Sequence, residues 1–117
     1  MTSPVRVGGS FASAVAPAWL SVTAEFDGVM PCTRFAGLSE AAEALVAALR
    51  QCRMGQQQRA YAEGCLIGPG ANEVITASLL RHGAWSLTVY LIEGEGTASR
   101  WAGHSVFIRA PKTTGGR

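Results

Sequence analysis

A helical pattern in the middle of the chain is the strongest constraint that the sequence places on the fold. Ser39 is a residue type that caps helix N-termini, and it precedes a stretch without Gly or Pro. Glu40 near the start and Arg50 near the end match the polarity of the helix dipole. The spacing predicts one amphipathic helix that covers a core with a single apolar stripe: Ala42, Leu45, Val46, Leu49 and Cys52.

The segments before this helix carry strand patterns. Val5–Gly9 alternates apolar and polar residues and ends in a glycine pair, which predicts a first strand with a bend or bulge. Trp19–Phe26 alternates cleanly and predicts a second strand. Asp27-Gly28 is a typical hairpin turn and leads into a third strand, Val29–Phe35. Pro31 favours an edge position or a bulge for that third strand.

The sequence after the helix is interpreted as more strands. Arg59–Ile67 returns to an alternating pattern and predicts a fourth strand. Glu73–Arg81 and Trp85–Glu93 are interpreted as two β-rich segments, joined by the hairpin-length connection His82–Ala84. Ser105–Arg109 predicts a final short strand.

This order of elements predicts a mainly β fold, a five-stranded OB-like barrel with one α-helix between strands 3 and 4. An α+β fold, with an antiparallel sheet and one packed helix, has nearly the same signature and remains the alternative. The 117 residues suffice for one domain. We assign the domain to residues 1–110 and a short basic tail to 111–117.

Several short stretches point to one family. They are the run Phe35-Ala-Gly-Leu-Ser-Glu before the helix, the opening Val5-Arg-Val, the segment Ala60–Gly64 and the segment His82–Val89. With these stretches the chain resembles the OB-fold family of bacterial single-stranded DNA-binding proteins and their primosomal relatives. The resemblance implies a protein that binds single-stranded DNA without catalysis. It also places Phe35 where the family has an aromatic that stacks on a base.

The chain departs from the family in three places. Members usually carry a tryptophan in the third strand and another in the loop after the fourth, whereas this chain has Val29–Pro31 and Ile67–Gly70. Many members end in an acidic tail that recruits partner proteins, whereas residues 110–117 are basic. These departures favour a relative encoded by a phage, a plasmid or another mobile element.

Binding of single-stranded DNA requires cations for phosphates and flat side chains for bases. If the strands are regular, Arg59 and Tyr61 share a face, whereas Arg34 and Phe35 point to opposite faces. Arg81 flanks the predicted hairpin turn. The candidate nucleic-acid-binding residues are Trp19, Arg34, Phe35, Arg59, Tyr61, Arg81 and Trp85.

Charge and composition leave two classes of partner open. The net charge is +2, and Lys112 is the only lysine among ten cations. Arginine suits both phosphate pairing and base stacking. We therefore expect single-stranded DNA as the partner and a homo-oligomer as the assembly. The competing hypothesis is a small protein-binding module of a phage or plasmid, such as an inhibitor of a host defence complex or an assembly factor.

Other functional classes are not expected. Cys32, Cys52 and Cys65 lack metal-site spacing and are interpreted as buried free thiols, so no metal and no cofactor are expected. The sequence has no catalytic motif, which argues against an enzyme. The Ala-rich segment 7–20 is interrupted by Gly, Ser and Pro and is not interpreted as a secretory signal. We expect a soluble, cytoplasmic protein without a membrane partner.

Overall fold

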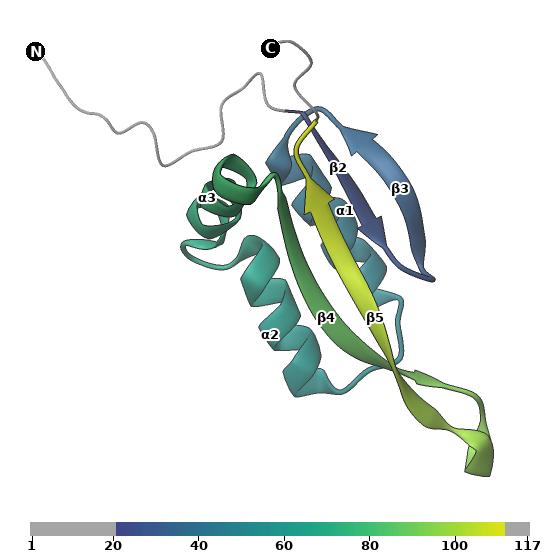
Figure 1. The fold of residues 1–117 in the computed structure, drawn as a ribbon. Helices are drawn as coiled ribbons and strands as arrows, with labels where there is room; N and C mark the ends of the chain where they lie inside the picture. Colours follow the sequence, from purple (N-terminus) through teal and green to yellow (C-terminus); the bar gives the residue numbers. More distant parts are fainter. Residues whose placement is uncertain (1–20, 112–117) are drawn as a thin grey trace, which may run out of the picture.

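The sheet is open, and three helices lie against one of its faces (Figure 1). The structure is a computed structural model that describes residues 21–111. Its four antiparallel strands have the order β3-β2-β5-β4. The elements along the chain are β2 (Val22–Phe26), β3 (Met30–Phe35), α1 (Leu38–Arg50), α2 (Gln56–Ile67), α3 (Ala71–His82), β4 (Ala84–Glu93), the 3-10 turn η1 (Gly96–Ala98) and β5 (Arg100–Arg109).

The predicted OB-like barrel is therefore wrong. Strands β3 and β4 are the two outer strands of the sheet and do not meet, so the sheet does not close. The alternative, an α+β fold with an antiparallel sheet, is nearer to the structure. It expected one packed helix, however, where the structure has three in succession between β3 and β4.

The core lies between the helices and one face of the sheet. Phe26 of β2 and Ile108 of β5 are fully buried there, together with Leu45 and Leu49 of α1. Strands β2 and β4 both pair with β5, and β4 matches β5 over its whole length, from Ala84 opposite Arg109 to Glu93 opposite Arg100. The other face of the sheet is not covered by any described element.

Helix α1 confirms the amphipathic pattern. Its buried residues include Ala42, Leu45, Val46 and Leu49, as the apolar stripe predicts. The predicted cap is wrong, because Gly37 occupies the N-cap position and no side chain caps the helix.

The two segments after α1 were misassigned as strands. Arg59–Ile67 lies in helix α2, where Ala62 and Leu66 are buried four residues apart. Glu73–Arg81 lies in helix α3, where Ile75 and Leu79 are buried at the same spacing. Consequently the connection 82–84 is no hairpin. Instead, Gly83 ends α3 in the left-handed region at φ 79°, and β4 begins at the next residue.

The predictions for the first hairpin are confirmed. Gly28 has a φ of 80° in the turn between β2 and β3, and the Val29 N–H donates to the Phe26 carbonyl at 2.8 Å. Pro31 lies in β3, which is an edge strand as expected. The predicted strands 85–93 and 105–109 are also present, the second with five more residues at its start.

Several predictions fall outside the described residues. These are the strand Val5–Gly9, the residue Trp19 and the basic tail from Lys112 onward. The three cysteines are free, but Cys32 is exposed and Cys52 and Cys65 are only half-buried, so the predicted burial is wrong for Cys32 and only partly met by the other two. Within residues 21–111, no helix has the length and apolar run needed to cross a membrane.

Candidate peptide-binding edge of the sheet

Strand β4 is an edge strand of the sheet that residues 21–111 form, and side-chain and main-chain groups of the protein bind parts of its outer side. The side chain of Gln58 in α2 binds both main-chain groups of Tyr90. Its Nε2 donates to the Tyr90 carbonyl at 2.8 Å, and its Oε1 accepts from the Tyr90 N–H at 2.7 Å. Nearby, the Ile92 N–H donates to the carbonyl of Arg53 at 2.8 Å. At the start of the strand, the Ser78 hydroxyl donates to the Ala84 carbonyl at 2.6 Å.

These contacts identify which main-chain groups face outward. In an antiparallel strand, every second residue directs both its N–H and its C=O to the same side. Ala84, Tyr90 and Ile92 bind groups outside the sheet, so Ser86 and Thr88, at the same parity, also face outward. Both residues are exposed. Their main-chain groups have no hydrogen-bond partner among residues 21–111. Within residues 21–111, two N–H and two C=O groups therefore lack a partner at this edge, between Gln58 on one side and Ser78 on the other.

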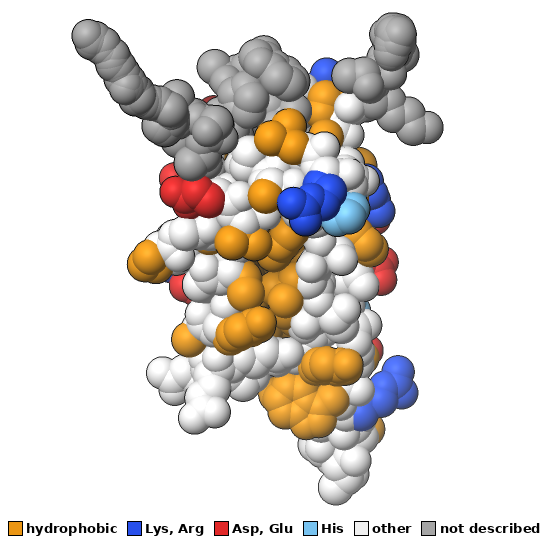
Figure 2. Space-filling view, turned by 60° about the vertical axis from the view of Figure 1, so that its left-hand side comes forward, with side chains coloured by type: hydrophobic (Ala, Val, Ile, Leu, Met, Phe, Trp, Pro, Cys, Tyr) orange, Lys and Arg blue, Asp and Glu red, His pale blue; other side chains and the backbone are white. Residues whose placement is uncertain are grey.

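An apolar hollow lies beside this part of the edge. Its volume is about 260 Å³, and α2, α3, the loop between them and β4 all contribute. Trp85 contributes from β4, and Val74 of α3 is 63% exposed. Figure 2, which brings the helical side of the edge forward, shows hydrophobic side chains gathered in a band down the middle of this face. The lining residues are Gly64, Cys65, Pro69, Gly70, Ala71, Val74 and Trp85.

A second hollow of about 220 Å³ continues along α3 and shares Val74 with the first. It also includes Ser78, the residue that binds the first carbonyl of β4, and it ends at Arg81 and His82 in the last turn of α3. Figure 2 shows a cationic side chain and a histidine side by side at the upper end of the hydrophobic band. Apolar and cationic groups therefore border one continuous surface. We call it the β4 edge surface and define it as the edge at Ser86 and Thr88 with these two hollows.

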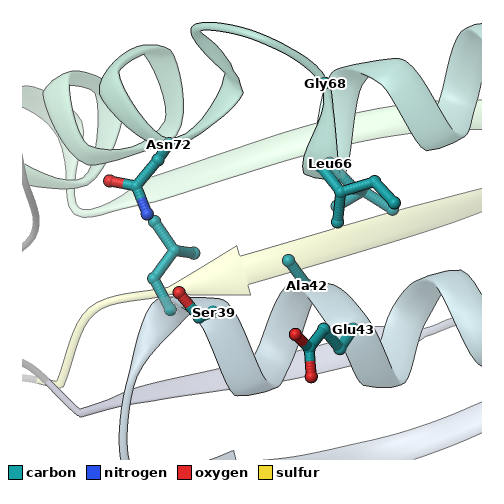
Figure 3. A pocket seen from close by; sticks show the side chains of 8 residues that line it. Ser39, Ala42, Glu43, Leu66, Gly68 and Asn72 are labelled. Atoms are coloured by element: carbon teal, nitrogen blue, oxygen red, sulfur yellow. The ribbon is translucent and has the colours of Figure 1, made fainter.

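A third hollow, of about 240 Å³, lies between α1 and the loop that joins α2 to α3. Figure 3 shows Ser39, Ala42 and Glu43 on one side of it, opposite Leu66, Gly68 and Asn72. Its lining contains a single carboxylate and no histidine, cysteine or cation. Nowhere in residues 21–111 do three metal-ligating side chains gather. This hollow therefore has no cluster of metal-ligating side chains.

The predicted nucleic-acid-binding residues do not share a face. Arg34 lies on the open face of the sheet, whereas Phe35 packs against the core. Arg59 and Tyr61 are in helix α2, where a separation of two residues directs side chains apart. Trp19 lies outside the described residues.

Two predicted residues, Arg81 and Trp85, do border a common surface, the β4 edge surface. Gln58, Ser86 and Thr88 were not predicted from the sequence. The alternation of Ser86 and Thr88 with apolar residues was a usable signal for a strand with one exposed face. No signal in the sequence showed that their main-chain groups would lack a partner, because that depends on the order of strands.

The open face of the sheet carries few unpaired cations. Arg109 stacks on the ring of Phe107, 4.3 Å from its centroid, and its Nη1 lies 3.3 Å from Oε1 of Glu25. All eight acidic residues of the chain lie within 21–111, whereas three of its ten cations lie outside: Arg6, Lys112 and Arg117. The described part of the chain therefore has seven cations against eight carboxylates, and no excess of positive charge.

No protein-family model, no curated protein and no solved structure matches this chain.

Proposed function

We propose that this protein is a non-catalytic protein-binding module that takes an extended segment of a partner protein onto the edge of β4. The observation that carries the proposal is the pair of outward-facing residues Ser86 and Thr88. Among residues 21–111 their main-chain groups have no partner, whereas the positions on either side are bonded by Gln58 and Ser78. A partner strand would complete these hydrogen bonds by extending the sheet.

The β4 edge surface also meets the energetic requirement for such binding. Each main-chain hydrogen bond contributes about 0.5–1.5 kcal/mol net. Association costs at least about 4 kcal/mol in lost freedom. Four hydrogen bonds alone therefore give little affinity, and a side-chain anchor is needed. The hollow beside Trp85 and Val74 supplies a place for that anchor.

The charge distribution favours a protein partner over single-stranded DNA. The expectation of DNA binding rested on an OB-like barrel, which the protein does not have, and on a set of residues that lie on different faces. Residues 21–111, taken alone, also lack excess positive charge. DNA binding remains the second hypothesis, and the same protein preparation tests it with a labelled single-stranded oligonucleotide at low salt.

The direct test is a pair of substitutions at one edge residue. Thr88→Pro removes the outward N–H without touching the pairing with β5, because an edge strand tolerates proline where its N–H faces outward. Thr88→Ala keeps that N–H and is the matched control. Peptides selected from a random displayed library on the full chain are expected to bind Thr88→Ala as they bind the unmodified protein, and to lose about tenfold or more in affinity for Thr88→Pro.

Three results would reject the proposal. The first is a library that yields no binding peptide, and the second is equal affinity for the two variants. The third is tight, salt-dependent binding of the oligonucleotide that Thr88→Pro leaves unchanged.

A further inference from the structure

We propose that the partner segment is an antiparallel strand with two apolar residues at alternate positions, followed by an acidic residue. This inference rests on the proposed function and specifies what the β4 edge surface recognises. The three parts of the surface lie in a fixed order along β4. Along β4 from Tyr90 toward Ala84, the first part is Thr88 and Ser86, whose main-chain groups would bind the partner strand. The second part is Trp85 with its hollow, and the last is Arg81, near Ala84.

The register of the added strand follows from the outward-facing groups. In antiparallel pairing, the partner residues opposite Ser86 and Thr88 exchange their main-chain hydrogen bonds with β4. Their side chains lie on the open face of the sheet, on the same side as Ser86 and Thr88. The partner residue between them lies opposite Leu87 and directs its side chain to the helical face. The partner residue opposite Trp85 does the same.

The helical face provides an apolar environment for these two side chains. In Figure 1, α2 and α3 lie on the side of β4 that is away from β5. A strand added to the β4 edge would therefore have its helical face directed toward these two helices. There Cys65 of α2, Val74 of α3 and the ring of Trp85 line a hollow of about 260 Å³. A branched or aromatic side chain fits such a space, and its burial supplies the anchor that the main-chain bonds need.

The charge at the far end of the surface selects the next residue of the partner. Arg81 is exposed and shares a hollow with Ser78, which binds the carbonyl of Ala84. No ion pair joins Arg81 to any residue of the described chain, and His82 lies beside it. An antiparallel partner reaches this end after its apolar residues, so a carboxylate on its C-terminal side lies near Arg81. The expected partner sequence therefore has an apolar residue opposite Leu87, any residue opposite Ser86 and a second apolar residue opposite Trp85. An acidic residue follows, either directly or after one residue of any type.

The first test is the consensus of peptides selected on the full chain. The alternating apolar pair with a following Asp or Glu is the expected enrichment. A consensus without apolar alternation, or with lysine or arginine at the acidic position, would overturn the inference.

The second test uses a matched pair on helix α3. Val74 and Leu80 are 63% and 60% exposed, so both tolerate a polar residue, but only Val74 lines the two hollows. Val74→Asp is expected to weaken binding of the selected peptides about tenfold or more, whereas Leu80→Asp leaves it unchanged. Equal effects of the two substitutions would contradict the anchor.

The third test reverses the charge at the end of the surface. Arg81→Glu is expected to weaken binding about fivefold to tenfold, and a peptide with lysine in place of its acidic residue restores it. Glu73→Gln, on the same helix but outside both hollows, is the control.

Loss of binding in Thr88→Pro together with unchanged binding in Val74→Asp and Arg81→Glu would reject this inference and leave the proposed function standing. Unchanged binding in Thr88→Pro would reject the proposed function itself.

Discussion

Gln58 binds the main chain of Tyr90 as a neighbouring strand would, with its amide donating at 2.8 Å and accepting at 2.7 Å. One side chain of helix α2 thereby closes one position of an edge strand. This contact separates the closed part of the β4 edge from the part that remains available at Ser86 and Thr88. Edge strands are places where foreign chains pair, and proteins commonly restrict them.

The first prediction concerns this contact. Gln58→Ala leaves both main-chain groups of Tyr90 to solvent, and each lost bond costs about 0.5–1.5 kcal/mol. We expect the free energy of unfolding, measured by chemical denaturation, to fall by about 1–2 kcal/mol. The Tyr90 amide should also exchange its hydrogen faster. Gln57→Ala is the control, because Gln57 is exposed and has no side-chain hydrogen bond to another described residue. A Tyr90 amide that exchanges equally slowly in both variants would show that Gln58 does not protect the edge.

The second prediction concerns pH. The His104 side chain is only 14% exposed and lies between two acceptors, with Nδ1 2.8 Å from the Asp27 carbonyl and Nε2 2.6 Å from Oε2 of Glu93. Arg100 also approaches Glu93, at 3.9 Å. The hydrogen bond to the Asp27 backbone, followed by that to Glu93, raises the pKa of His104 above its ordinary value of 6.5. The charged imidazole donates to both acceptors, which the neutral ring cannot do.

A raised pKa means that the folded protein holds this proton more tightly than the unfolded chain. The stabilisation is complete below the unfolded pKa and disappears as the pH rises through the folded pKa. We expect the free energy of unfolding to fall over that window in the unmodified protein and in His82→Gln, but not in His104→Gln. Denaturation at a series of pH values measures it. An NMR titration that gives His104 a pKa at or below the ordinary 6.5 would contradict this explanation.

The third prediction tests the assignment of residues 71–82 as a helix. In helix α3, Ile75 and Leu79 are buried, whereas Ala77 between them is exposed. A strand would instead place all three side chains on one face, because its side chains alternate with a period of two. Leu79→Ala should cost about 2–5 kcal/mol of unfolding free energy, whereas Ala77→Gln should change it by no more than about 0.5 kcal/mol. Comparable losses in the two variants, measured by chemical denaturation, would contradict the helical packing.

Local patterns predicted the first half of the fold better than the second. The stripe of α1 contains Leu45, Val46 and Leu49, large residues whose spacing fits only a helix. Turn chemistry was equally direct at Asp27-Gly28, where the glycine adopts a positive φ. These features depend on neighbours in the sequence, so they could be predicted.

Helix α2 was misassigned because its buried residues are few and small. Only Ala62 and Leu66 are buried, and the alternation of Ala60 and Ala62 with polar residues imitated a strand. Because α2 and α3 were both interpreted as strands, the predicted order of elements matched an OB-like barrel, which the protein does not form. The site could not follow, because the availability of Ser86 and Thr88 is set by the position of β4 at the end of the sheet.

Hydrogen exchange at single residues of β4, in the full and unliganded chain, distinguishes an available edge from a covered one. We predict that the amides of Ser86 and Thr88 exchange rapidly, while Leu87 and Val89, whose groups face β5, and Tyr90, held by Gln58, are protected. Protection of Ser86 and Thr88 equal to that of Leu87 would show that another strand already covers the edge, and it would contradict the proposal.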